Sequence, residues 1–472
     1  MHHGHGDSTS DLEQHRLSVK SDAPVAPPPD IETQHITVQG SHETGYTSDD
    51  SLDNEKYSLP PVDGGKDAWL CLLGAFILEM VVWGFAFSFG VLQDYYSTNA
   101  PFSHDHSSRS IVGSCCMGIL YLASPISLFV LQKWPRITRI NSVLGLAIAV
   151  TGVLTSSFAT KMWQLTITQG VIYPIGGAML YYPVLLFVDE WFERRKGLAF
   201  GVAWAGSGVA GVVFPLLLRW ALSRFSFKIT MWAWSIGMVV LVCPILAFVK
   251  PRIPVNTDTP KAQSLSFSFL RTRSWIIFQI GSLTQSIGYF APSLYMPTYA
   301  RVIAHQSAMG ETTPVTALNA GSVLGFIMVG YLVDRWHAAT VVLAMTVSTV
   351  ILVFALWGLS VTLAPICVFS ALYGVVAGSA AATWPGMAKI IKKEDPSAPV
   401  GMVLGTLTAG RGIGSIACGP ISEALIKTDW AWTGHTASLG YGTKFGGLIV
   451  FTGVTACFGI IGFAARKLRL IQ

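Results

Sequence analysis

Twelve apolar segments, each long enough to cross a lipid bilayer as a helix, constrain this chain more than any other feature of its sequence. Lipid offers the backbone no hydrogen-bond partner, so segments of about 20 apolar residues cross it as helices. Only 12% of the 472 residues are charged, about half of what soluble domains carry. The predicted spans are residues 69–92, 110–131, 140–158, 163–188, 197–221, 229–249, 274–299, 315–333, 339–361, 363–388, 400–426 and 444–465. The sequence therefore predicts an all-α membrane protein with 12 transmembrane helices.

The charged residues lie mostly outside these segments and predict the orientation. Residues 1–62 hold eleven acidic residues, three Lys or Arg and almost no apolar cluster, which predicts a disordered tail. Lys and Arg gather in the loops on the tail's side of the membrane, so the positive-inside rule places both termini in the cytosol. Because the basic excess belongs to these loops, we expect no nucleic-acid partner. The predicted parts are the tail (1–62), a six-helix bundle (63–249), a cytosolic loop (250–273), a second six-helix bundle (274–466) and a C-terminal tail (467–472).

The two predicted bundles share an internal repeat. Residues 197–208 read GLAFGVAWAGSG and residues 401–412 read GMVLGTLTAGRG, so that four glycines and one alanine recur at an offset of 204. Each stretch lies in the fifth predicted span of its half. Small residues four positions apart let helix backbones approach closely. Matched halves of this kind are typical of transporters that open a central site alternately to each side.

Motifs of soluble enzymes point away from catalysis. Residues 206–211 fit a dinucleotide-binding fingerprint, but they lie inside a predicted span with no strand before them. The sequence contains no P-loop, metalloprotease helix motif or nucleophile-elbow serine. The seven cysteines lie in apolar segments and lack metal-ligand spacing. We therefore expect no enzymatic activity, no cofactor and no metal site.

Two ionisable residues lie deep inside predicted spans, Glu79 in the first and Arg411 in the eleventh. Arg411 occupies the repeat position of Ser207, so the helix can be built there without a charge. Charges at bilayer depth are costly and usually serve function. The sequence leaves three roles open: binding a solute, carrying a proton on Glu79, or neutralising each other as a structural pair.

Short motifs near the span ends, and one inside the eleventh span, resemble those of a known family. Residues 330–335 (GYLVDR) resemble the G-x-x-x-D-R loop of the major facilitator superfamily. Residues 63–65 (DGG) and 191–201 (WFERRKGLAFG) are similar to the two signatures of its monocarboxylate-porter-like members, and residues 411–414 (RGIG) to the fungal branch. The resemblance covers residues 63–466. It implies two six-helix bundles and secondary active transport by alternating access.

Two departures from the family bear on the solute. The animal members place a lysine in the first helix and an arginine in the eighth, whereas this chain has Phe87 and Phe326 at the aligned positions. Both cationic groups for a small carboxylate are therefore missing. The expected solute is larger and partly aromatic or amphipathic, such as an organic acid, a vitamin or a secondary metabolite.

The expected solute site combines Arg411 and Glu79 with aromatic side chains from both halves. These are Trp83, Tyr181, Trp204, Tyr289, Phe290, Tyr295, Phe326 and Trp384. The expected gate at the cytosolic turns consists of Asp334, Arg335, Arg194 and Arg195.

The expected partners are the small-molecule solute, the lipid bilayer and, if transport is coupled, protons. We expect a functional monomer in the plasma membrane, with a vacuolar or other internal membrane as the alternative. The sequence does not separate uptake from efflux of a biosynthetic-cluster product. A non-transporting membrane receptor is the remaining rival.

Overall fold

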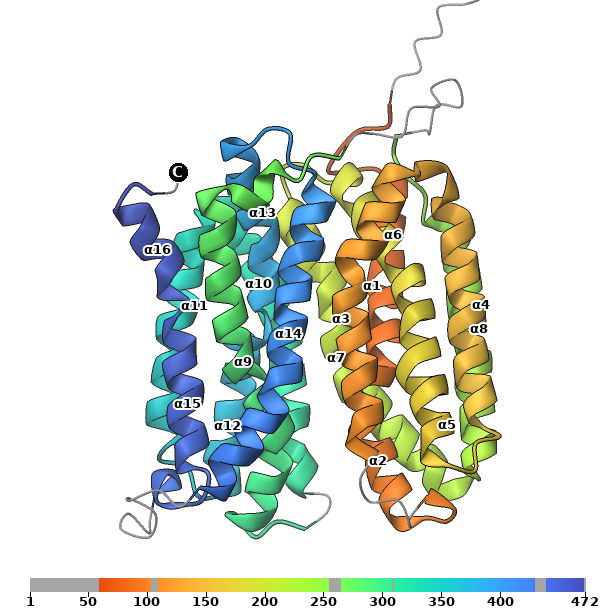
Figure 1. Ribbon diagram of the computed structural model, residues 1–472, viewed down its shortest axis with the longest axis vertical. Coiled ribbons are helices and arrows are strands. Elements are labelled where there is room, and N and C mark those ends of the chain that lie inside the picture. Colours follow the sequence, from red (N-terminus) through yellow and green to blue (C-terminus); the bar gives the residue numbers. More distant parts are fainter. Residues whose placement is uncertain (1–58, 103–108, 254–264, 308–309, 429–438, 471–472) are drawn as a thin grey trace, which may run out of the picture. The chain divides into compact units, whose positions relative to one another are not determined.

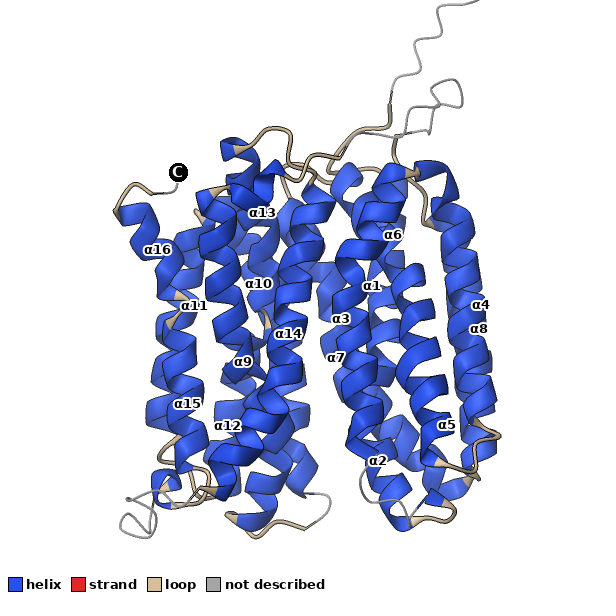
Figure 2. Cartoon of the chain, in the orientation of Figure 1, coloured by secondary structure: helices blue, strands red, loops and turns tan. Residues whose placement is uncertain are grey.

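The computed structural model describes residues 59–102, 109–253, 265–307, 310–428 and 439–470. All of them belong to one compact unit, Ser58–Gln472. Most of the predicted N-terminal tail and residues 254–264 of the predicted inter-bundle loop lie outside the described residues. The described residues form helices and loops and contain no strand (Figure 2).

The helices fall into two halves that stand side by side in Figure 1. The first half consists of α1 (Lys66–Phe87), α2 (Phe89–Thr98), α3 (Arg109–Lys133), α4 (Thr138–Ser156), α5 (Met162–Ile167), α6 (Tyr173–Trp191), α7 (Lys196–Arg224) and α8 (Phe227–Phe248). The second half consists of α9 (Arg273–Val302), α10 (Thr313–Arg335), α11 (Ala338–Ile351), α12 (Leu363–Tyr373), α13 (Trp384–Glu394), α14 (Val400–Lys427), α15 (Gly446–Cys457) and α16 (Ile460–Lys467).

Eleven helical stretches in the described residues are long and apolar enough to cross a membrane. Several join two helices, as α5 and α6 join through a π-helical turn at Thr168–Ile172. These stretches coincide with eleven of the twelve predicted spans. The remaining predicted span, residues 274–299, forms the 30-residue helix α9, which is too polar to count among the eleven. The total of twelve spans therefore stays a prediction.

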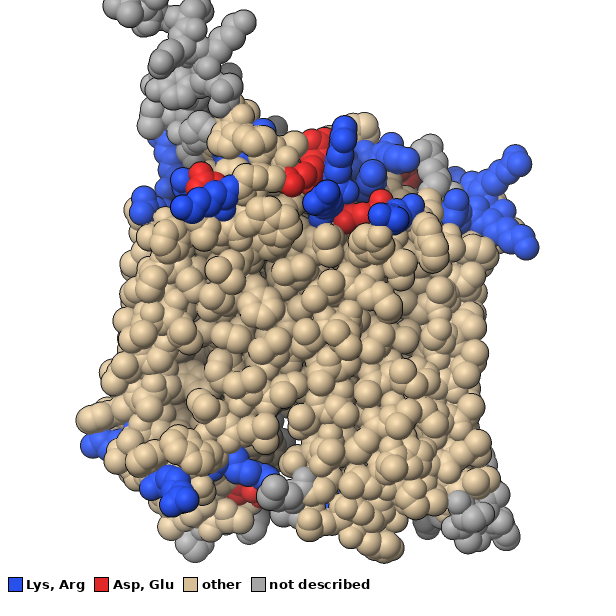
Figure 3. Space-filling view, turned by 180° about the vertical axis from the view of Figure 1, so that it is seen from behind, with Lys and Arg blue, Asp and Glu red and all other residues tan. Residues whose placement is uncertain are grey.

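The outer surface is apolar in the way that a lipid-facing surface requires. Large side chains such as Ile126, Ile236 and Leu324 are exposed, and an apolar surface of this extent is rare on a soluble monomer. Figure 3 shows Lys, Arg, Asp and Glu at the two ends of one face and none across its middle. The charges are denser at the upper end, where α1 begins and α16 ends in Figure 1. We call this end the basic end.

The two halves meet along two helix pairs, α7 with α10 and α3 with α14. Three of the four glycines in each copy of the internal repeat lie at these two seams, whereas Gly206 packs against α1 and Gly410 against α9 within their own halves. A Cβ atom added at Gly208 of α7 would lie 2.8 Å from the Val323 side chain of α10. One added at Gly401 of α14 would lie 2.7 Å from the Gln132 amide nitrogen of α3. The repeat therefore serves close packing between the halves, as small residues do in membrane helices.

Gly201→Ala is expected to destabilise the protein by about 1–3 kcal/mol, the usual cost of overpacking. A methyl group there would overlap the backbone carbonyl oxygen of Phe326 across the α7–α10 seam. At the repeat-related Gly405 the nearest atom is the flexible Leu128 side chain at 3.0 Å, so Gly405→Ala should cost less. Thermal unfolding in detergent measures both. Gly237→Ala in α8, which meets open space, is the control and should not lower the melting temperature.

Candidate functional site

Aromatic rings connect the two halves at two points. Tyr121 of α3 lies between Trp83 of α1 and Phe290 of α9, with ring-centroid distances of 4.6 and 6.2 Å. Trp204 of α7 meets Trp384 of α13 edge to face at 5.6 Å. Aromatic pairs in such arrangements contribute about 0.5–1.5 kcal/mol beyond the area that they bury. Both contacts cross the junction between the halves.

The rings continue into each half. The Tyr181 hydroxyl of α6 accepts a hydrogen bond from the Trp204 indole nitrogen at 2.9 Å. Tyr289 lies 4.7 Å from Phe290 and stacks on Tyr373 at 6.2 Å with an interplanar angle of 13°. We call the connected rings the aromatic network: Trp83, Tyr121, Tyr181, Trp204, Tyr289, Phe290, Tyr373 and Trp384.

Arg411 lies against this network from α14. Only 7% of the residue is exposed, and the guanidinium carbon lies 4.0 Å from the centroid of the Tyr289 ring and 5.4 Å from that of Phe290. The Tyr121 hydroxyl also interacts with it. Desolvated cation–π contacts of this kind contribute about 2 kcal/mol. Among the described residues no ion pair involves Arg411.

Glu79 lies on the other side of the network, in α1. It is 4% exposed, and its carboxyl group interacts with the polar groups of Tyr181, Ser207 and Trp83. Within the described residues, its Oε2 atom and the Trp83 indole nitrogen complete no hydrogen bond of normal geometry. Burial without a cation disfavours the charged form of a carboxyl group. The direct Glu79–Arg411 ion pair that the sequence left open is not among the ion pairs of the described residues.

The structure brings most of the residues expected at the solute site together, and two lie apart. Tyr295 is half-buried, and its hydroxyl lies 3.5 Å from the Gly419 carbonyl oxygen. Phe326 is buried at the α7–α10 seam. Neither makes a ring contact with the aromatic network within the described part of the chain.

The structure also adds residues that the sequence did not single out, namely Tyr121, Tyr373 and Ser207. Ser207 had a signal, because it is the repeat counterpart of Arg411. Both positions are 7% exposed and face the aromatic network from opposite halves. The sequence contained no feature that distinguished Tyr121 and Tyr373 from ordinary packing residues.

A cavity of about 30 Å³ lies beside Arg411 inside the second half. A cavity needs roughly 10–15 Å³ on this measure to hold one water molecule. It can therefore take about two water molecules, or a small chemical group, but no whole organic solute.

At the basic end, Asp334 joins the two halves. Its carboxylate, at the end of α10, accepts hydrogen bonds from the backbone nitrogens of Gly197 and Leu198 at 2.7 and 2.8 Å. These are free donors of the first turn of α7, where the helix dipole favours a negative charge. The other seam, between α3 and α14, has no corresponding carboxylate within the described part of the chain. Gln132 lies there beside Gly401, and its Oε1 atom has no partner in the described residues.

Asp63 anchors the turn before α7 from the other side. Its carboxylate accepts hydrogen bonds from the backbone nitrogens of Glu193, Arg194 and Arg195 at 2.9–3.0 Å. Burial opposes ionisation here, but these three donors hold the pKa of Asp63 below its ordinary value. The contribution of this anchor to stability is therefore present at neutral pH and is lost only as the pH falls through that lowered pKa.

The three arginines of the expected gate are placed differently from its one acidic residue, Asp334. The backbone nitrogens of Arg194 and Arg195 donate hydrogen bonds to the Asp63 carboxylate. The Arg335 guanidinium carbon lies 4.4 Å from the centroid of the Tyr331 ring, one turn back in α10. In this conformation the contact between the halves uses the Asp334 carboxylate and helix backbone.

Asp334→Asn is expected to weaken the joint between the halves by about 0.5–2 kcal/mol, the usual contribution of a helix cap. The amide keeps one acceptor oxygen but loses the charge that the α7 dipole favours. A lower melting temperature in detergent would measure this loss. The control is Asp395→Asn, because that carboxylate binds Ser268 and Ser397 at the basic end without joining α7 and α10. An equal drop in both variants would contradict the cap.

Comparison with known proteins places these features in a family. The profile of the Major Facilitator Superfamily matches residues 69–419. The MFS-type transporter opdF of Penicillium oxalicum is 27% identical over 420 residues, which cover 88% of this chain and 94% of the relative. The Aspyridones efflux protein apdF of Emericella nidulans is 25% identical over 415 residues, which cover 87% and 82% of the two chains.

A solved structure shares the fold. The crystal structure of the human organic anion transporter MFSD10 aligns over 84% of this chain and all of its own length, with a TM-score of 0.59. Only 12% of the aligned residues are identical, so the likeness concerns the fold alone.

Proposed function

The chain belongs to the Major Facilitator Superfamily, and on that premise we propose that it is a secondary active transporter of a small, partly aromatic organic solute. The site between its two halves opens alternately to each side of the membrane. Matched halves that rock against each other around a central site are the usual basis of such transport.

One observation carries the proposal: a buried cation and a buried carboxyl group flank aromatic rings where the halves meet. Arg411 and Glu79 are each less than 8% exposed, and no ion pair in the described residues neutralises either. Arg411 interacts with the Tyr121 hydroxyl between the halves, and Glu79 interacts with Trp83, whose ring lies 4.6 Å from that of Tyr121. An ionisable side chain at this depth is costly and rare, and it usually marks a functional site.

The aromatic network supports a solute with a flat or conjugated body. Its rings present apolar faces with a few polar groups among them, which is the usual lining of small-molecule sites. The hydrogen bonds of Asp334 to the start of α7 support a gate at the basic end, and in this proposal transport requires that joint to open.

Efflux is the direction that we propose, because a relative that covers most of this chain is named as an efflux protein for aspyridones. The basic end faces the cytosol by the positive-inside rule, and the protein works as a monomer in the plasma membrane. Glu79 carries the coupling proton.

A metabolite comparison tests the function. Cells without the gene and cells that overexpress it are compared for small organic compounds retained inside and released outside. The expected result is one compound or chemical series that is retained in the null cells and released faster on overexpression. Identical metabolite profiles in all cells at verified surface expression would contradict transport, and the opposite distribution would reverse the direction.

A further inference from the structure

We infer that the cavity beside Arg411 is an anion subsite, and that it receives the negatively charged head group of the solute. A carboxylate is the chemistry that it fits best. This inference rests on the proposed function, because it names the class of solute that the central site carries. The site is distinct from the two cationic positions that the family resemblance implied, which are Phe87 and Phe326 here.

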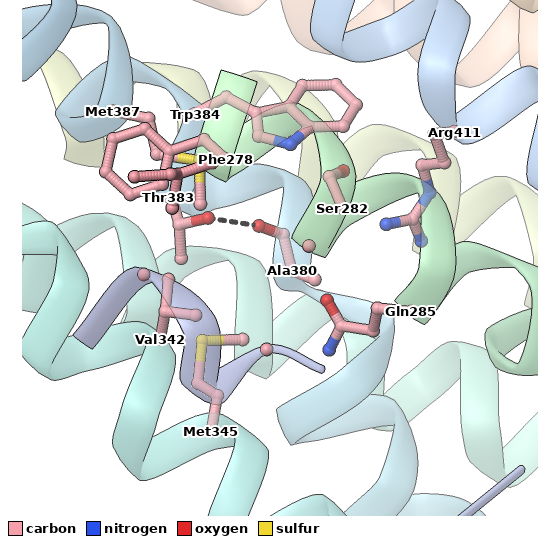
Figure 4. Close-up of a pocket in the computed structure, with 14 residues that line it drawn as sticks. Phe278, Ser282, Gln285, Val342, Met345, Ala380, Thr383, Trp384, Met387 and Arg411 are labelled. Atoms are coloured by element: carbon pink, nitrogen blue, oxygen red, sulfur yellow. Dashed lines mark hydrogen bonds between the residues drawn. The ribbon is translucent and has the colours of Figure 1, made fainter. Parts of the chain in front are cut away.

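The polar groups of the cavity converge from two helices of the second half. Arg411, Ser282 and Gln285 all line the cavity, and Figure 4 shows them on the same side of it, across from Thr383, Met345 and Met387. Arg411 comes from α14, whereas Ser282 and Gln285 lie about one turn apart on α9. The Thr383 hydroxyl on the opposite wall is already used, since it donates to the Ala380 carbonyl oxygen at 2.7 Å.

The charge of the cavity favours an anion. Among the described residues, no acidic side chain lines the cavity and none forms an ion pair with Arg411. A buried cation without a partner is unfavourable. A guanidinium offers five N–H donors in a planar fork that matches a carboxylate. The Ser282 hydroxyl and the Gln285 amide can donate as well as accept, and Arg411 only donates, so an anionic acceptor finds a donor in each of the three.

The volume limits what can enter. At about 30 Å³ the cavity accepts a head group and not a ring. Met345, Met387 and Phe278 form a buried apolar wall on the far side. The body of the solute must therefore lie outside the cavity, on the side of the aromatic network.

Two residues connect the cavity to that network. Trp384 lines the cavity and contacts Trp204 in the other half. Arg411 lines the cavity and lies against the Tyr289 ring. A solute whose head group binds Arg411 thus places its body next to rings from both halves. The inferred solute class is an organic anion with an aromatic or conjugated body.

The test uses the full-length protein in detergent with two probes of nearly equal size, benzoate and the neutral benzyl alcohol. Thermal stabilisation and quenching of tryptophan fluorescence report binding, because Trp384 lines the cavity. Benzoate should stabilise the wild-type protein, and benzyl alcohol should do so much less.

Two variants at one position separate charge from contact. Gln285→Glu places a carboxylate beside Arg411 and should weaken benzoate binding at least tenfold while the protein stays folded, because the new pair satisfies the guanidinium. Gln285→Met removes the amide without adding charge and should weaken binding less. Measured melting temperatures of the ligand-free variants show whether each one folds.

Three results would overturn the anion subsite: no response to benzoate, an equal response to both probes, or equal benzoate binding by wild type and Gln285→Glu. The metabolite comparison described above separates this failure from failure of the proposed function. If that comparison finds a neutral compound, the protein is a transporter without an anion subsite.

Discussion

Arg411→Ser is expected to lower the initial transport rate per surface copy by about 10- to 100-fold. Hydrogen bonds to charged groups contribute about 1.5–3 kcal/mol, and each 1.4 kcal/mol corresponds to about a tenfold change. Serine should preserve the fold at this position, because the repeat places Ser207 at the matching position of α7. The loss should therefore appear in transport while surface expression stays normal.

Two further variants identify what the guanidinium does. Arg411→Lys keeps the charge but loses the planar fork and the stacking on Tyr289, so transport should stay low. Arg411→Ser combined with Glu79→Gln removes a hypothetical pair, and it should not recover transport because the described residues form no such pair. Initial rates with the compound found by metabolite comparison, normalised to surface protein, measure all three. Recovery by the double variant would indicate a structural pair, and full transport by Arg411→Ser would contradict both roles.

The arrangement of the spans could be predicted from the sequence because lipid imposes a simple rule. A backbone that crosses lipid must satisfy its own hydrogen bonds, so apolar length alone marks the spans. The glycine repeat predicted matched halves, and the structure places three of its four glycines in each half at the seams between them. Glu79 and Arg411 were recognisable because a charge inside an apolar segment is rare.

The rotation of each helix could not be predicted in the same way. In a soluble protein the polar face of a helix marks the side that faces water, but lipid and protein interior both favour apolar side chains. Tyr121 at the network and Tyr295 away from it therefore look alike in sequence. In α9 the difficulty is different. Its Ser282 and Gln285 line an interior cavity, and such polar residues lower the mean hydropathy by which a membrane span is recognised.

Glu79→Gln is expected to abolish accumulation against a gradient and to remove the pH dependence of transport, while exchange of solute persists. Each pH unit of proton gradient corresponds to about 1.4 kcal/mol and thus to about tenfold accumulation per coupled proton. Glutamine imitates the protonated acid permanently, so steps that need no net proton movement continue.

The surroundings of Glu79 favour this role. The groups that interact with it are Trp83 on its own helix, Tyr181 from α6 and Ser207 from α7, all of them neutral at physiological pH. Arg411 lies against the Tyr289 ring and forms no ion pair with Glu79 in the described residues. A solute anion bound at Arg411 would reach the same network, so protonation of Glu79 and solute binding would influence each other through one short path.

The measurement compares accumulation and exchange in vesicles over a series of imposed pH gradients. Glu423→Gln is the matched control, because that carboxylate is exposed and paired with Lys427 at 2.7 Å, and it should leave both activities unchanged. Accumulation by Glu79→Gln with the wild-type pH dependence would show that Glu79 is structural. Loss of exchange together with accumulation would instead place Glu79 in solute binding, because only a proton carrier is dispensable for exchange.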